Sequence, residues 1–329
     1  MDILITGNAG YIGKLVTEKY LADPDIKSIY SIDLLPVPES LRNNPKLHWI
    51  QADLAVPGWE EKIPSDIALD AVIHCAFKIR NPYGKKRAVE ENNTAACRNV
   101  FSFAFDRNVP TLIYLSSVAT YGAKPANIGR LLTEEEPLDE IENAYGYQKA
   151  LSERILNELL AQKNPSTRVF VLRLNSVTGP RGQGLESKFG LITFLKKLLP
   201  FVIETNPYWA RQFVHEEDVA QIIYLLATQL TTRRAPNDGK NPEVFNIAPE
   251  KFLTARDMAK LLDKKVLHIP AWTVQPLFWI AWNISFGRIP TRPDSYKGLI
   301  YPINVDGSHI KKIGFDYAHT AEEALMAKK

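Results

Sequence analysis

The chain has 329 residues, of which 45% are hydrophobic and 23% are charged, and its formal net charge at pH 7 is +3. This composition is typical of a globular protein with one large or two medium domains, and the lack of a long basic block argues against nucleic-acid binding. Two cysteines, Cys75 and Cys97, are too few for a disulfide framework and lack the spacing of metal ligands, so we expect buried free thiols and no metal site.

In the first half of the chain, short runs rich in β-branched residues alternate with helical stretches. The strands are predicted at 2–6, 28–33, 47–51, 70–75, 111–117 and 168–174. Helical periodicity is present at 11–22, 85–107 and 143–163. This alternation predicts an α/β protein with a doubly wound parallel sheet, the Rossmann arrangement. The N-terminal MDILITG leads directly into a strand and lacks a targeting leader, so we expect a cytoplasmic protein.

The second half is less regular. A helix with an acidic first turn is predicted at 215–230, a strand at 243–248 and a capped helix at 254–263. Since no long linker interrupts the chain, a second domain must pack against the first. We expect a dinucleotide-binding domain and a smaller, mixed substrate-binding domain. The predicted division assigns 1–174 and 211–248 to the first domain, and 175–210 and 249–329 to the second.

The first predicted strand ends in the glycine-rich stretch TGNAGYIG. A strand, a glycine turn and a helix let the backbone approach a pyrophosphate and direct a helix N-terminus at its charge. The candidate cofactor-binding residues of this loop are Gly7, Asn8, Ala9, Gly10, Tyr11, Ile12 and Gly13. Asp33 closes the second strand, where a carboxylate accepts hydrogen bonds from an adenosine ribose and repels a 2′-phosphate. No arginine follows it before Arg42, so NAD is favoured over NADP.

Several further motifs follow in order along the chain. They are QADL (51–54), VIHCAF (72–77), LSSVATYG (115–122), YGYQK (145–149) and RQFVHEEDVA (211–220). Together with the glycine loop, they resemble the extended short-chain dehydrogenase/reductases of the NAD-dependent epimerase/dehydratase family over nearly the whole chain. The resemblance implies further cofactor-binding residues, namely Asp53, Leu54, His74, Cys75, Ala76, Asn93 and Lys149, with a mainly structural role for Asn93.

The same resemblance implies that Ser117, Tyr145 and Lys149 are catalytic. Tyr145 and Lys149 are four residues apart and lie on one face of a helix. A nearby ammonium group and an oxidised nicotinamide both favour the phenolate, which lowers the pKa of the tyrosine. We expect Tyr145 to act as general acid/base and Ser117 to bind the substrate oxygen, while hydride passes to the nicotinamide. Lys149 is also expected to hold the nicotinamide ribose.

The segment RLNSVTGP (173–180) departs from the pattern of relatives that act on nucleotide-linked sugars. Their asparagine position is occupied by Ser176, and Asn175 comes one residue earlier, which reverses the direction of a strand side chain. Arg211 and Arg292 match arginines that contact a substrate phosphate in those relatives. Asn175, Ser176, Arg211 and Arg292 are therefore candidate substrate residues, together with Ser117.

The leading hypothesis is an NAD-dependent epimerase or dehydrogenase of a nucleotide-linked sugar. The first alternative is an NAD(P)-dependent dehydrogenase or reductase of a bulky apolar, sterol-like alcohol or ketone, and the second is a non-catalytic dinucleotide sensor. Dehydration is disfavoured because Val118 and Ala119, not carboxylates, follow the serine. The resemblance also implies a homodimer formed through the helices at 85–107 and 143–163.

One aromatic segment, 271–287, permits three interpretations. It contains Pro276 and is short for a membrane span, so no stable membrane insertion is expected. Its aromatic residues are Trp272, Phe278, Trp279, Trp282 and Phe286. A helix that covers the core of the smaller domain is favoured, and an apolar wall of the substrate pocket is the alternative. Docking on a membrane surface is less favoured, because Arg288 is the only nearby cation in the sequence.

Overall fold

Seven parallel strands form the central sheet of the protein. The computed structural model describes residues 1–182, 196, 199–232, 241–289 and 291–327. These strands are β1 (Asp2–Thr6), β2 (Ser28–Asp33), β3 (Leu47–Gln51), β4 (Ala71–His74), β5 (Thr111–Ser117), β6 (Arg168–Leu174) and β11 (Glu243–Ile247). Their spatial order is β11-β6-β5-β4-β1-β2-β3. Every pairing between neighbours in this sheet is parallel.

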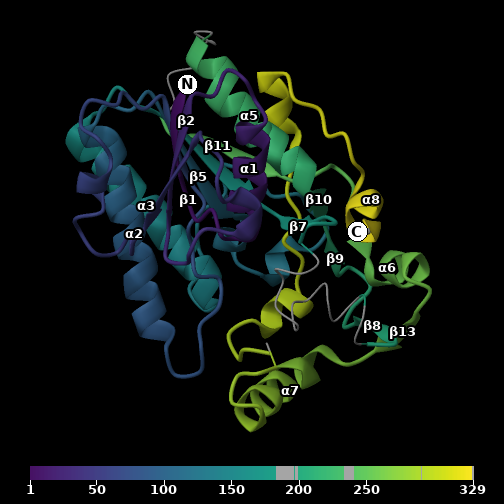
Figure 1. The fold of residues 1–329 in the computed structure, drawn as a ribbon. Helices are drawn as coiled ribbons and strands as arrows, with labels where there is room; N and C mark the ends of the chain where they lie inside the picture. Colours follow the sequence, from purple (N-terminus) through teal and green to yellow (C-terminus); the bar gives the residue numbers. More distant parts are fainter. Residues whose placement is uncertain (183–195, 197–198, 233–240, 290, 328–329) are drawn as a thin grey trace.

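Helices cover both faces of this sheet (Figure 1). Helices α1 (Tyr11–Leu21) and α5 (Glu216–Thr232) pack on one face, around a core that includes Val16 and Phe170. Helices α2 (Lys86–Asp106) and α3 (Ala144–Lys163) pack on the other, around a core that includes Phe101. The strands are buried on both sides, which explains their nearly continuous apolar sequence. The predicted doubly wound fold is confirmed.

The strand order reverses between β1 and β4. The chain leaves β1 for α1 on one face and leaves β4 for α2 on the other, so the carboxyl ends of these two strands flank a crevice. In open α/β sheets, ligands bind at such a reversal point. The glycine loop after β1 and the VIHCAF motif therefore meet at this position.

The rest of the chain forms small paired strands and short helices. The strands are β7 (Ser176–Thr178) with β10 (Phe213–His215), β8 (Phe201–Glu204) with β13 (Lys265–His268), and β9 (Ala210–Arg211) with β12 (Leu253–Thr254). The helices are α6 (Ala255–Leu261), α7 (Ala271–Ile284) and α8 (Ala321–Met326). A separate apolar core, which includes Val202, Trp209 and Met258, holds β8, β9 and α6 together.

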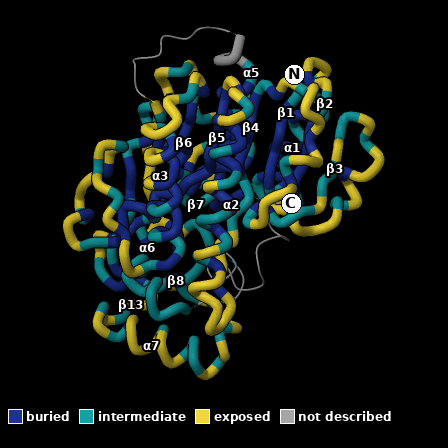
Figure 2. The backbone as a smooth tube through the Cα atoms, turned by 90° about the vertical axis from the view of Figure 1, so that its left-hand side faces the viewer, coloured by how far each residue is buried: buried dark blue, intermediate teal, exposed yellow. Residues whose placement is uncertain are grey.

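Helix α7 differs from the favoured sequence-based interpretation. We expected its aromatic residues to cover a core, but Val274 is its only buried residue. Trp272 is 78% exposed, Trp279 58% and Ile284 75%. Figure 2 shows the helix as a largely exposed projection at the end of the molecule away from the N-terminus. The interpretation as a core-covering helix is therefore wrong. Among the described residues, no helix combines the length and the hydrophobicity needed to cross a membrane.

Candidate active site

The glycine loop forms a tight cradle between β1 and α1. Gly7 has a φ of +77°, and a Cβ atom there would lie 2.6 Å from the backbone nitrogen of Ala76. A Cβ atom on Gly13 would lie 2.1 Å from the carbonyl oxygen of Gly7. No side chain caps α1 at Gly10, so amides of its first turn keep their capacity to bind an anion. This geometry fits the pyrophosphate of a dinucleotide.

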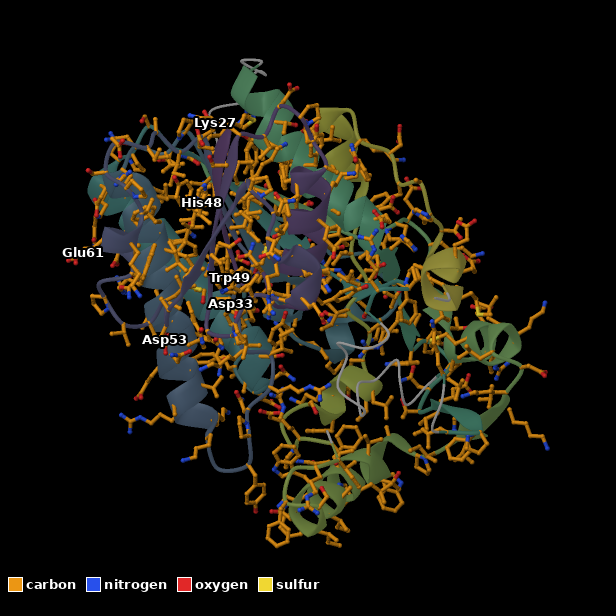
Figure 3. All side chains as sticks on the ribbon, viewed as in Figure 1. Lys27, Asp33, His48, Trp49, Asp53 and Glu61 are labelled. Carbon is orange, nitrogen blue, oxygen red and sulfur yellow. The ribbon has the colours of Figure 1, made fainter. Side chains whose placement is uncertain are left out.

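Two carboxylates lie beside this loop. Asp33 accepts hydrogen bonds from the backbone amides of Ala9 and Leu35, both at 2.9 Å. Asp53 accepts from the amide of Ala55 at 2.9 Å and from the side chain of Asn92 at 3.3 Å. Figure 3 shows Asp33 and Asp53 toward the same end of the sheet, away from Lys27. Asp33 thereby stabilises the loop itself.

Other cofactor candidates have structural contacts. The buried His74 shares a hydrogen bond of 2.7 Å with Thr6, and its other ring nitrogen lies 3.4 Å from the Sγ atom of Cys97. Asn93 joins the backbone of Lys78 to the side chain of Gln148. These contacts connect the reversal point to helices α2 and α3, as expected for a mainly structural Asn93.

The remaining candidates differ in accessibility. Asn8 and Leu54 are buried, whereas Tyr11 and Ile12 are half-buried in the first turn of α1. Cys75 and Ala76 are half-buried directly after β4. Burial raises the pKa of the Cys75 thiol to about 12, so it is a protonated thiol at neutral pH.

The catalytic candidates Ser117 and Tyr145 are brought together by close packing of α3. Asn143 caps this helix by accepting a hydrogen bond from the amide of Gly146 at 3.1 Å. A Cβ atom on Gly146 would lie 2.3 Å from the carbonyl oxygen of Ala119, so only glycine permits this approach. Ser117 ends β5 and accepts a hydrogen bond from the amide of Ala119 at 3.2 Å. The first turn of α3 thereby places the Tyr145 phenol beside the Ser117 hydroxyl.

Lys149 is buried deeper than Tyr145. Its ammonium group donates a hydrogen bond of 2.5 Å to the carbonyl oxygen of Leu115. The same group lies 3.7 Å from the ring centroid of Phe77 and 4.7 Å from that of Tyr114. Burial lowers the pKa of Lys149 to about 8, against the opposite influence of nearby Cys97, Glu153 and Cys75. The cation therefore lies in an aromatic and poorly hydrated environment.

The pKa of Tyr145 is raised in the structure. Burial is the larger cause, and a hydrogen bond with Ser117 acts in the opposite direction. The expectation that Lys149 lowers this pKa is therefore wrong for these residues, because the ammonium group is directed at Leu115 and Phe77. The expected effect of the nicotinamide stays a prediction.

A cavity of about 550 Å³ opens in front of Ser117 and Tyr145. This volume is within the usual range for small-molecule sites. Four other predicted residues line the same cavity, namely Asn175, Ser176, Arg211 and Arg292. These residues come from segments that lie far apart in the sequence. All the candidate substrate residues are therefore brought together beside the catalytic pair.

Arg211 lines this cavity and is half-buried. It donates hydrogen bonds to the hydroxyl of Ser176 at 3.3 Å and to the carbonyl oxygen of Gly298 at 3.4 Å. Its Nε atom is buried and has no hydrogen-bond partner among the described residues. Burial lowers its pKa to about 10, so the side chain is still a cation at neutral pH. One donor of this cavity-lining side chain is therefore buried without a partner among the described residues.

Asn175 and Arg292 already have partners. Asn175 donates hydrogen bonds to Gln212 at 3.1 Å and to the carbonyl oxygen of Ile303 at 3.4 Å. The Nε atom of Arg292 lies 3.2 Å from a carboxylate oxygen of Asp294. Both side chains nevertheless line the cavity, and Asp294 does as well.

A sequence model described as the NAD dependent epimerase/dehydratase family matches residues 3–248. The chain belongs to this family. The expectation that the chain belongs to the NAD-dependent epimerase/dehydratase family is confirmed. A UDP-glucose 4-epimerase of Lactobacillus helveticus is 30% identical over 186 residues. That match spans 56% of this chain and 54% of the length of the relative.

Solved structures of other proteins share the fold of this epimerase/dehydratase chain. A UDP-glucose 4-epimerase from Thermotoga maritima, solved with UDP-glucose, has a TM-score of 0.71 and 20% identity, covering 99% of this chain and 96% of that chain. A dTDP-glucose 4,6-dehydratase from Streptomyces venezuelae, solved with NAD bound, has a TM-score of 0.72 and 20% identity. The match covers 99% of this chain and 94% of that chain.

Sequence reasoning missed two residues of this family member's site. Phe77 contacts the Lys149 ammonium, and its ring lies 5.9 Å from that of Tyr145 in an edge-on arrangement. Gly146 permits the approach of α3 to Ala119. Phe77 ends the motif VIHCAF, and Gly146 follows the tyrosine in YGYQK. Their positions in these motifs were the sequence features that could have identified them.

Proposed function

We propose that this protein is an NAD-dependent epimerase or dehydrogenase of a nucleotide-linked sugar. The observation that carries the proposal is the single cavity that joins Ser117 and Tyr145 to Arg211 and Arg292. A reactive hydroxyl pair beside two arginines suits a substrate with a sugar at one end and phosphates at the other.

The cradle of residues 7–13 would hold the pyrophosphate of the cofactor, and Asp33 and Asp53 would hold its adenosine. NAD, when bound, supplies the hydride-accepting chemistry. Lys149 is placed to bind the nicotinamide ribose. Its ammonium group contacts the carbonyl oxygen of Leu115 and the rings of Phe77 and Tyr114. With a pKa of about 8, it is mostly a cation at neutral pH.

Tyr145 would act as the general base on the sugar hydroxyl, taking its proton at the phenol oxygen, and as the general acid in the reverse direction. Ser117 would hold the same substrate oxygen and the phenol in position. The closeness of these two side chains rests on Gly146 and the Asn143 cap, which fix the first turn of α3.

Arg211 and Arg292 would bind the diphosphate. The unpaired Nε atom of Arg211 supports this role, since an arginine presents several donors in a fixed fork that suits phosphate. Ser176, at the asparagine position of the relatives, would offer a hydroxyl. The predicted two-domain division is part of this proposal, with the substrate between the domains.

The alternative of a bulky apolar substrate loses one of its two supports. That hypothesis relied on Ser176 and on residues 271–287 as an apolar wall, whereas no residue of α7 lines the cavity. The lining instead includes the charged side chains of Glu140, Glu142 and Lys297.

Calorimetric titration with UDP and with UDP-glucose tests the substrate class. We expect the wild-type protein to bind both, and Arg211→Met to weaken binding about tenfold or more, through loss of charge-assisted hydrogen bonds. The exposed Arg154→Met provides a matched control that keeps the wild-type affinity. Failure of UDP to bind, or equal affinity of the Arg211 variant, would refute the assignment of the phosphate site.

A further inference from the structure

The exposed apolar face of α7 has no role in the proposed reaction. Trp272, Trp279, Ile280 and Ile284 recur at spacings of seven, eight and twelve residues and therefore share one side of the helix. All four are exposed. A helix that is apolar over most of its surface is normally buried, and a large exposed apolar patch usually marks an interaction site.

A second segment lies beside this helix. The Tyr83 hydroxyl donates a hydrogen bond of 2.9 Å to Asn283, and its ring lies 5.9 Å from that of Trp282 and 6.1 Å from that of Phe286. These contacts place the loop before α2 against α7, at the end of the molecule opposite the labelled Lys27 (Figure 3).

This loop and the first turn of α2, together residues 77–88, carry a dense positive charge. Residues 77–88 contain no aspartate or glutamate and five exposed cations, which are Lys78, Arg80, Lys85, Lys86 and Arg87. Lys86 lies 4.0 Å from Asp294, and Arg87 lies 2.8 Å from Glu91. Residues 269–289 contain Arg288 and no acidic residue. The apolar face is thus bordered by a clear excess of positive charge.

We propose that α7 and residues 77–88 together form a surface that docks on an anionic phospholipid membrane. Apolar and aromatic side chains beside lysines and arginines are the combination that binds the interface of such a membrane. The loop comes from a point nearly 200 residues earlier in the chain. The sequence alone therefore showed Arg288 as the only cation near the helix.

The length of α7 fits a helix that lies on the membrane. Its 14 residues span about 21 Å, less than the roughly 30 Å of a bilayer core. Charge also favours a lipid surface over a second copy of the chain. A symmetric contact through this face would bring two sets of the same cations together, and like charges repel.

The proposed docking surface adjoins the active-site cavity. Ile79, which is 60% exposed, belongs to the loop and also lines the cavity. The 3₁₀ helix η6 (Tyr296–Leu299), which contacts α7, contributes Lys297 and Gly298 to the same lining. Docking through α7 would therefore hold the cavity close to the membrane.

Flotation of the full-length protein with lipid vesicles tests this inference. We expect binding to phosphatidylcholine vesicles that contain phosphatidylglycerol, little binding to phosphatidylcholine alone, and loss of binding at high salt. Two double variants separate the contributions. Trp272→Ser with Trp279→Ser should weaken partitioning about tenfold or more. Lys78→Gln with Lys85→Gln should weaken it about fivefold for each cation removed.

A control variant removes one cation elsewhere. Lys27→Gln should float like the wild type, since Lys27 lies at the opposite end of the molecule. The inference is overturned if the wild type does not float, or if both double variants float unchanged. It is also overturned if sedimentation shows that the tryptophan variant only converts a dimer into monomers, because a second copy would then cover the face. UDP binding by the tryptophan variant should stay normal, which separates this test from the proposed function.

Discussion

At the scale of single residues, the arrangement around Tyr145 depends on side chains from three parts of the chain. Tyr145 and Lys149 share a helix face, as their spacing predicts. The ring of Phe77 contacts both, and Ser117 reaches the phenol from the end of β5. The sequence could predict the helix pair because its geometry is local. It could not predict the raised pKa of Tyr145, which follows from burial among distant segments.

His74 should make the protein sensitive to acid. Burial, assisted by the charge of Lys149, lowers its pKa to about 3, from about 6.5 in an unfolded chain. Between these values the unfolded chain binds a proton that the folded protein does not. The free energy of unfolding should therefore fall, by about 1.4 kcal/mol per pH unit, as the pH decreases from 6.5 toward 3. Denaturant titrations between pH 7 and pH 5 on wild type and His74→Gln measure this slope.

Between pH 7 and pH 5, the free energy of unfolding of His74→Gln should fall less than that of the wild type, whatever its value at pH 7. His48→Gln, which changes an exposed ring, is the matched control and should keep the wild-type slope. Equal slopes for wild type and His74→Gln would show that the buried imidazole does not control acid stability.

At the scale of secondary-structure elements, the junction between β1 and α1 determines cofactor binding. Gly13→Ala would place a Cβ atom 2.1 Å from the carbonyl oxygen of Gly7, so the loop must shift. We expect this variant to bind NAD about tenfold or more weakly. Its free energy of unfolding should be about 1–3 kcal/mol lower than that of the wild type. Titration with NAD, followed by intrinsic fluorescence, measures the first effect.

Gly298→Ala is a suitable control, because its Cβ atom would meet only Arg211, at 3.8 Å. It should bind NAD like the wild type. NAD affinity in Gly13→Ala equal to that of the wild type would contradict the role of the loop as a pyrophosphate cradle.

Helix α7 shows where sequence reasoning fails at this scale. An apolar run at helical spacing normally indicates core, and nothing in residues 271–287 distinguishes an exposed helix from a buried one. Its exposure depends on packing with distant segments. The cations beside it belong to a loop nearly 200 residues away, which only the contacts of Tyr83 reveal.

At the scale of the whole molecule, the central sheet could be predicted almost residue by residue. Strands β1, β2, β3, β5 and β6 match their predicted ranges, and β4 and β11 are shorter by one or two residues. Buried parallel strands and amphipathic helices have strong local signatures. The short strands of the second half do not, since β8 pairs with β13 and β9 with β12 across long intervals.

The candidate site residues could be named from the sequence, but the shape of the cavity that they line could not. Family motifs gave the residues, and the fold brings Asn175, Arg211 and Arg292 to one cavity with Tyr145. The charged residues that line the cavity, including Glu140 and Lys297, could not be predicted from the sequence because they lie outside the motifs.

Turnover of nucleotide sugars tests the central claim most directly. The protein, supplied with NAD, is incubated with UDP-glucose, UDP-galactose and UDP-glucuronic acid, and the products are identified by NMR. We expect the wild type to convert at least one of them, and Tyr145→Phe to be slower by about a hundredfold to ten-thousandfold with NAD binding retained. Tyr147→Phe, in the same helix, should keep wild-type activity. Full activity of Tyr145→Phe, or conversion of an apolar alcohol but of no nucleotide sugar by the wild type, would contradict the account.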